Sequence, residues 1–148
     1  MPIPNIERMD DRMAAVLTAM QEYPGLVARV IKRSLTHYKN QSEYDLKKGI
    51  LTLVSAGEGD YNQGLGMIAR DGTHRMLIIG QLKADDNNPE SAEDMELDMI
   101  EEVKSFVRSG IDGMDLMMDN VKHSRQQEAP YGWFVIYMDA GPQRNSLY

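Results

Sequence analysis

One amphipathic helix constrains the fold of this sequence more than any other stretch. It covers residues 88–110 and starts with Asn88, whose side chain can accept a hydrogen bond from a first-turn amide. Pro89 follows at the first helical position, where a missing N–H costs nothing. Acidic residues crowd the first half and Lys104 and Arg108 the second, which complements the helix dipole. Gly110 can adopt the left-handed conformation that ends a helix.

This helix has a single apolar face. At about 100° per residue, seven apolar side chains fall in one arc, opposite most of the charged residues. They are Ala92, Met95, Met99, Ile100, Val103, Phe106 and Val107. Leu97 points to the polar side, and Glu96 points into the apolar arc. We expect Glu96 to extend outward from the edge of the core, with a buried functional carboxylate as the alternative. The helix is therefore predicted to lie on a core.

A second helix is predicted over residues 5–23. Its apolar residues lie within an arc of about 100°, and Pro24 and Gly25 end it. The apolar arc consists of Ile6, Met9, Met13, Val16, Leu17 and Met20. Glu7, Arg8, Asp11 and Arg12 are expected on its outer face.

The remaining stretches alternate between strands and loops. Strands are predicted over 26–34, 49–56, 67–70, 73–82, 114–124 and 133–140, with loops over 35–47 and 57–66. The Asp71-Gly72 pair is the favoured turn of a hairpin between 67–70 and 73–82. Residues 76–79 are apolar on both faces, as is the last strand. The former strand should therefore be central in a sheet and the latter well covered.

The order of these elements indicates an α+β fold. A mostly antiparallel sheet should carry two amphipathic helices packed on one face. The order is not βαβαβ, so no doubly wound nucleotide-binding fold is implied. A length of 148 residues predicts a single domain, 1–148.

Composition excludes several classes of protein. There are no cysteines, which removes disulfides, thiolate metal sites and thiol nucleophiles. A net charge of −7 argues against general affinity for nucleic acid. No apolar run approaches the ~18 residues of a membrane span, and the N-terminus does not look like a signal peptide. We therefore expect no membrane association.

No catalytic arrangement is recognisable in the sequence. His37, His74 and His123 lie in separate polar segments, and nothing resembles a nucleophile turn or a zinc motif. Four glycines between 57 and 66 do not fit a phosphate-binding spacing. The acids at 85, 86, 90, 93 and 94 lack the ligand pattern of a calcium loop. We therefore predict no catalytic, cofactor-binding or metal-binding residues.

Charge is unevenly distributed along the chain. Residues 90–108 hold seven acids against two bases, and residues 26–48 hold six bases against two acids. Two solvated faces would explain this. Self-complementary patches would also do so, because opposite charges on one subunit suit head-to-tail contacts in a ring. Candidate residues of such a subunit interface are Arg29, Lys32, Arg33, Glu101 and Glu102.

The order and character of the elements resemble the tail terminator proteins of long-tailed bacteriophages. The resemblance rests on RMDDRMAAVLTAM, GILTLVSAGEG, RMLIIGQLKA, MELDMIEEVKSFVRSG and APYGWFVIYMDAGPQR. It covers most of the chain in pattern, without a motif that would carry over individual residues. Other neck and head-completion proteins of the same virions are a close alternative.

The resemblance implies a structural virion protein rather than an enzyme. Six copies would form a ring that caps the tail tube, ends its polymerisation and joins it to the head connector. DNA would pass through the bore without specific binding, and the acidic balance suits that passage. The protein would be located in the virion tail after assembly in the host bacterial cytoplasm.

Two other hypotheses come from the residues. One is a small metal-dependent or hydrolytic enzyme that uses Glu96, Glu93 and a histidine. The other is an adaptor that binds a partner helix or strand through Trp133 and Tyr131. Tyr61 is a further candidate for a partner surface, although packing in the core or an interface would equally explain these aromatic residues.

Overall fold

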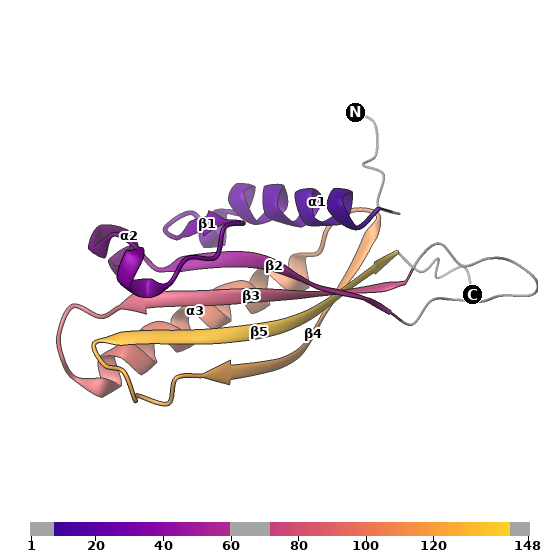
Figure 1. Cartoon of the computed structure of the whole chain (residues 1–148). Helices are drawn as coiled ribbons and strands as arrows, with labels where there is room; N and C mark the ends of the chain where they lie inside the picture. The colour runs from indigo at the N-terminus through magenta and orange to yellow at the C-terminus, as the bar shows by residue number, and fades with distance from the viewer. Residues whose placement is uncertain (1–7, 60–71, 143–148) are drawn as a thin grey trace, which may run out of the picture.

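The computed structural model describes residues 8–59 and 72–142 of the chain. Two long helices and five strands dominate it, with shorter helical turns between them (Figure 1). The elements are α1 (Met9–Glu22), η1 (Pro24–Leu26), β1 (Val30–Lys32), η2 (Tyr38–Asn40), α2 (Glu43–Lys48), β2 (Ile50–Gly59), β3 (Thr73–Lys83), α3 (Pro89–Ser109), β4 (Met114–His123) and β5 (Tyr131–Pro142).

The five strands form one sheet in the order β1-β2-β3-β5-β4. Short β1 runs parallel to β2, and the other neighbours are antiparallel. The predicted central position of β3 is confirmed, since β2 and β5 flank it. The predicted hairpin partner 67–70, and Asp71 of its turn, lie outside the described residues. Residues 57–59, predicted as loop, extend β2.

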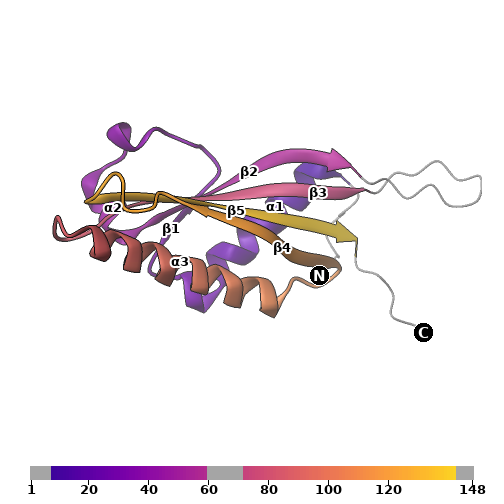
Figure 2. The same ribbon diagram turned by 90° about the horizontal axis from the view of Figure 1, so that it is seen from below.

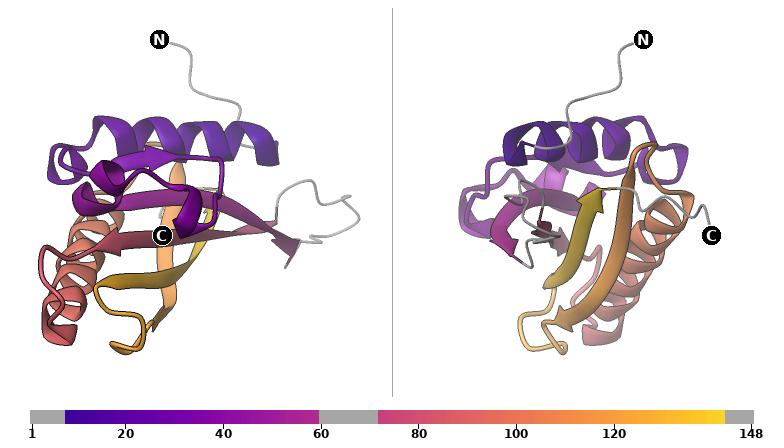
Figure 3. Two further views of the ribbon diagram at one scale, coloured as in Figure 1. Left: turned by 60° about the vertical axis from the view of Figure 1, so that its left-hand side comes forward. Right: turned by 90° about the vertical axis from the view of Figure 1, so that its right-hand side faces the viewer.

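Both long helices cover the same face of the sheet. α1 packs on β1 and β2, and α3 packs on β3, β5 and β4 (Figure 3). In Figure 2, α3 lies along one face, while the segment between β1 and β2 rises on the other. The predicted α+β fold, a mostly antiparallel sheet with two amphipathic helices on one face, is confirmed.

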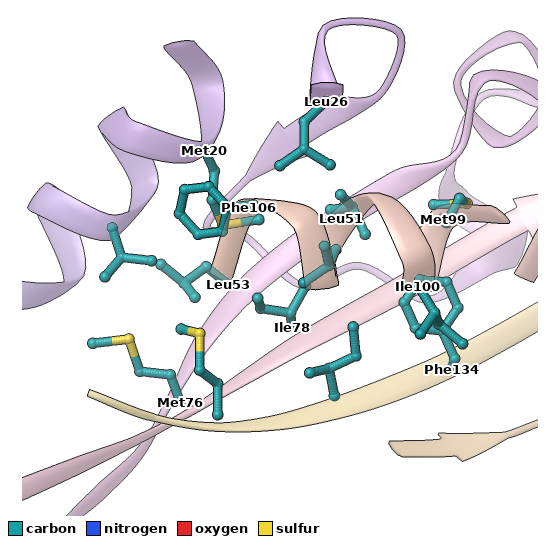
Figure 4. Packing of buried hydrophobic residues seen from close by; sticks show 14 of the residues in the cluster. Met20, Leu26, Leu51, Leu53, Met76, Ile78, Met99, Ile100, Phe106 and Phe134 are labelled. Atoms are coloured by element: carbon teal, nitrogen blue, oxygen red, sulfur yellow. The ribbon is translucent and has the colours of Figure 1, made fainter. Parts of the chain in front are cut away.

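The core lies between this sheet face and the two helices. Met13, Val16 and Met20 of α1 belong to it, and all seven residues of the predicted apolar arc of α3 belong to it or pack against it. Figure 4 shows Phe106 near Met20, above the sheet residues Leu53 and Ile78. Leu97, expected on the polar side, is 43% exposed. Helical periodicity therefore predicted the buried face of α3. For α1 it predicted Met13, Val16 and Met20 correctly but placed buried Arg12 on the outer face, and Ile6 of the predicted arc lies outside the described residues.

The ends of α3 are as predicted. The Asn88 side chain accepts a hydrogen bond from the Glu90 N–H at 3.1 Å, which satisfies one of the first-turn donors. At the other end, the Gly110 N–H donates to the Phe106 carbonyl at 3.1 Å. Gly110 has φ +77°, a conformation that favours glycine.

Two predictions in the N-terminal half were wrong. The strand predicted over 26–34 shrinks to Val30–Lys32, because Leu26 belongs to η1 and residues 27–29 form a turn. The loop predicted over 35–47 contains η2 and most of α2. Ser42 caps α2 by accepting from the Asp45 N–H at 3.1 Å, and Gly49, with φ +89°, ends it. These short-range signals were present in the sequence, but only Leu46 of α2 is buried, so no apolar periodicity revealed the helix.

Candidate functional site

The sheet face opposite the two long helices remains largely open. Residues of β3 alternate between the faces, so Leu77 and Ile79 point away from the core that holds Met76 and Ile78. The register sets Leu77 beside Tyr137 on β5, and Ile79 beside Val135. All four are half-buried rather than covered. β5, predicted to be well covered on both faces, is therefore well covered on one only.

At one end of this open face, a pocket of about 530 Å³ lies between the β1–β2 segment and the sheet. Thr36, His37 and Tyr38 of the segment line it, and so do Gln81 of β3 and Trp133 of β5. Its volume is within the ~300–1,000 Å³ that is typical of ligand sites. The pocket is thus large enough to hold a small ligand or a side chain of a partner protein.

Aromatic rings form much of the pocket. The His37 ring is stacked on that of Tyr38, with centroids 4.6 Å apart, and the Tyr38 ring lies 5.1 Å from that of Tyr131. Trp133 lines the same pocket and is 37% exposed. The structure therefore brings Tyr131 and Trp133 together at a surface site, outside the helix-covered core. Tyr61 lies outside the described residues.

Buried Gln81 ties the segment to the sheet. Its amide nitrogen donates to the Thr36 carbonyl at 2.9 Å, and its side-chain oxygen accepts from Gln41 at 3.2 Å. Gln41 in turn accepts from Lys32 Nζ at 2.7 Å. Thr36 and Gln81 both line the pocket, so the hydrogen bond between them holds two of its walls together. Lys83 beside it pairs with Glu43 and lies 5.5 Å from the Tyr131 ring centroid.

The expectation for Glu96 was wrong, because its side chain does not reach solvent. Glu96 is fully buried in the side of α3 that faces β5. The Ser124 hydroxyl donates to its Oε2 at 2.7 Å, and His123 Nδ1 lies 3.6 Å from Oε1. Burial raises the pKa of Glu96, and the hydrogen bonds from Ser124 and the nearby His123 partly oppose this. A serine and a histidine from the end of β4 thus make burial of this carboxylate tolerable.

The residues of the metal hypothesis are only partly brought together. His123 lies next to Glu96, whereas Glu93 accepts a hydrogen bond from Gln126 at 3.2 Å. Across residues 8–59 and 72–142, no group of three or more acidic or histidine side chains is placed to hold a metal ion. His37 and His74 lie in different places, at the aromatic pocket and in β3 respectively.

A second buried polar cluster was missed by the sequence analysis. Arg12, predicted on the outer face of the first helix, is fully buried and forms an ion pair with Glu58 of β2. His74 of β3 is also buried, and its Nε2 lies 2.8 Å from the Ser55 hydroxyl. Burial lowers the pKa of His74, and the positive charges of Arg12 and then Arg33 lower it further against the effect of Glu58. Burial of Arg12 is tolerated because Glu58 on the facing strand matches its charge, which helix periodicity cannot indicate.

The candidate interface charges meet within one chain. Arg29 Nε and Nη2 donate to the two carboxylate oxygens of Glu102 at 2.8 and 2.9 Å. The two predicted patches therefore already touch through these residues. Lys32 donates to Gln41, and Glu101 pairs with Lys104 one helical turn away. Arg33 is exposed. A role of all five in a subunit interface stays a prediction.

Comparison of the sequence with known protein families and with curated proteins finds no match. Among the described residues, no helix is both long and apolar enough to cross a membrane.

Proposed function

We propose that the chain is a structural subunit of a phage tail, of the tail terminator kind. Six copies form a ring that caps the tail tube, ends its polymerisation and joins it to the head connector. The observation that carries the proposal is the order of elements: α1, three strands, amphipathic α3, then two strands. The resemblance to the tail terminator family rests on this order. The protein is then a virion component, assembled in the host bacterial cytoplasm.

The open sheet face supports a role in assembly. Half-buried Leu77, Ile79 and Val135 form an apolar surface with exposed Trp133 at its end. Contiguous apolar surface of this kind marks contacts with other proteins. Such a face is suited to contacts with neighbouring subunits or with the tube.

The charge balance fits a bore through which DNA passes. A net charge of −7 disfavours phosphate contacts, so DNA can move without being retained. Exposed acids on α3, such as Asp94, Asp98 and Glu101, add to this balance. Their position relative to the bore belongs to the proposal.

Burial of Glu96 favours a structural role over a catalytic one. A catalytic carboxylate must reach a substrate, whereas the Glu96 side chain is buried between α3 and β5 and accepts a hydrogen bond from Ser124. The enzyme hypothesis predicts bound metal in stoichiometric amount, or an activity that disappears in Glu96→Ala. Metal analysis of the purified protein, with an assay of that variant, tests it.

Ring formation and tube binding test the main proposal. We expect light scattering to detect a particle of six chains, either free or once tail tubes are added. Negative-stain microscopy should show the ring at one end of the tube. A monomer that neither binds nor caps tubes would refute the proposal. Binding to the head connector without binding to tubes would instead favour a neck or head-completion protein.

A further inference from the structure

The aromatic pocket between the β1–β2 segment and β5 contains one carboxylate. Among its described lining residues, Glu128 is the only acid and none is lysine or arginine. Glu128 is exposed, and within the described part of the chain its carboxylate has no ion-pair or hydrogen-bond partner. The neighbouring cation Lys83 is paired with Glu43 instead. The pocket therefore has an unmatched negative charge.

The aromatic rings of the pocket differ in how far they are already engaged. Tyr131 contacts both Tyr38 and the ammonium of Lys83, and Tyr38 is also stacked on His37. Trp133 has no ring or cation partner among the described residues and is 37% exposed. Tryptophan is the side chain that attracts cations most strongly through its ring face. The free ring and the free carboxylate line the same cavity.

We propose that this pocket binds a basic side chain, arginine or lysine, presented by an extended segment of a partner protein. The cation would lie against the Trp133 ring and pair with Glu128, and its aliphatic stem would pack on the apolar walls near Ile79. A purely apolar occupant would cover part of the exposed Glu128 side chain without giving its carboxylate a partner, which is unfavourable. Charge complementarity therefore selects a cation.

The pocket is suited to such a ligand before it arrives. Its volume of about 530 Å³ can hold a long side chain with part of its backbone. Gln81 fixes the segment wall through the Thr36 carbonyl, so little ordering accompanies binding. The proposal concerns the single subunit and does not depend on ring formation.

Trp133 is the only tryptophan of the chain and reports on the pocket directly. The experiment titrates capped peptides Gly-Xaa-Gly into the protein at low salt and follows Trp133 fluorescence. Xaa is arginine, lysine, citrulline, norleucine or phenylalanine. We expect saturable changes with arginine and lysine, and citrulline, which keeps the arginine shape without its charge, should bind roughly tenfold more weakly. Raising the salt concentration should weaken binding of the charged peptides.

Two variants test the residue assignment. Glu128→Gln should weaken binding of the arginine peptide by about fivefold to tenfold, so that the arginine and citrulline peptides bind equally well. Asp98→Asn, an exposed change of the same kind on α3, should bind like the original protein. Circular dichroism of both variants checks that the fold is intact, which is expected because both positions are exposed.

Three results would overturn the proposal. Norleucine or phenylalanine peptides that bind as tightly as arginine would make the pocket an apolar site. Tighter binding of tetramethylammonium than of either basic peptide would assign it to small cations. Absence of any change in Trp133 fluorescence with the basic peptides, together with no heat of binding by calorimetry, would show that it is not a site for basic side chains.

Discussion

The Ser124 hydroxyl donates to the buried Glu96 carboxylate at 2.7 Å and so fastens α3 to the end of β4. Gly132 of β5 packs against the same oxygen, since a β-carbon at that position would be 2.5 Å from Glu96 Oε2. The Glu96 carboxylate therefore occupies the space that the missing side chain of Gly132 leaves free. The opposite side of this strand end borders the aromatic pocket, which Gly132 and Trp133 line.

Replacing Glu96 by glutamine should change how stability depends on pH. The folded-state pKa of Glu96 is raised above the ordinary 4.5, so the folded chain holds this proton more tightly than the unfolded chain. The stabilisation by the protonated carboxyl is complete below pH 4.5. It is lost as the pH rises through the raised pKa of the folded state. Relative to Glu96→Gln, the original protein should therefore lose free energy of unfolding with rising pH. Urea unfolding from about pH 4 to about pH 8 measures it.

Asp98→Asn on the same helix is the control for this series, because Asp98 is exposed. Its difference from the original protein should stay nearly constant with pH. A constant difference for Glu96→Gln as well would contradict a raised pKa.

Replacing Gly132 by alanine should destabilise the fold by about 1–3 kcal/mol. The new methyl group would meet both Glu96 Oε2 and Leu82 Cδ1, the latter at 2.8 Å. Gly141→Ala, on the same strand with nothing within 4 Å, should stay within about 0.5 kcal/mol. Thermal unfolding compares the two. Equal losses of stability in the two variants would mean that the side chains around Gly132 can move to accept the methyl group.

Replacing His74 by glutamine should reduce the loss of stability on acidification, a pH dependence opposite in sign to that of Glu96. Burial, Arg12 and Arg33 lower the pKa of His74 below the ordinary 6.5, so the unfolded chain binds this proton more tightly. The folded chain keeps its full stability above pH 6.5, where His74 is neutral in both states. That stability is lost as the pH falls from 6.5 through the lowered pKa of the folded state. The original protein should therefore weaken on acidification relative to His74→Gln. A parallel pH profile of the two proteins would rule this out.

The Arg29–Glu102 pair should contribute about 1 kcal/mol of coupling, because both side chains are partly shielded and the contact is bidentate. A double-mutant cycle with Arg29→Gln and Glu102→Gln measures it by urea unfolding. The coupling should decrease with added salt and be independent of protein concentration, since the pair lies within one chain. Coupling that appears only at high protein concentration would indicate a contact between subunits.

Ring assembly should respond to the interface charges that have no partner in another element among the described residues. Arg33 is exposed, and Glu101 pairs only with nearby Lys104 among the described residues. Arg33→Glu and Glu101→Lys should weaken assembly more at low salt than at high salt. Light scattering at two salt concentrations tests this, with Asp98→Asn as control. Unchanged assembly would leave α3 with a packing role alone. Reversal of Glu102 is unsuitable here, because it would also break the contact with Arg29.

Much of the fold could be predicted because its signals are local. Asn88, Pro89 and Gly110 set the ends of α3, and the spacing of Met99, Val103 and Phe106 sets its buried face. The candidate site could not be predicted in the same way. Tyr38 is far from Tyr131 in sequence, and only the path of the β1–β2 segment across the open face brings their rings to 5.1 Å.

Residue patterns alone thus determined the fold class, the central strand and the helix faces, because periodicity and capping depend on neighbours along the chain. The tertiary structure decided which charges are buried. Glu96 and Arg12 have the side chains that usually reach water, yet both are fully buried. Burial of a charge depends on whether the interior holds a partner for it. Ser124, just after β4, and Glu58 of β2 are both far in sequence from the residues that they pair with. That match is a property of the folded chain, which sequence periodicity does not contain.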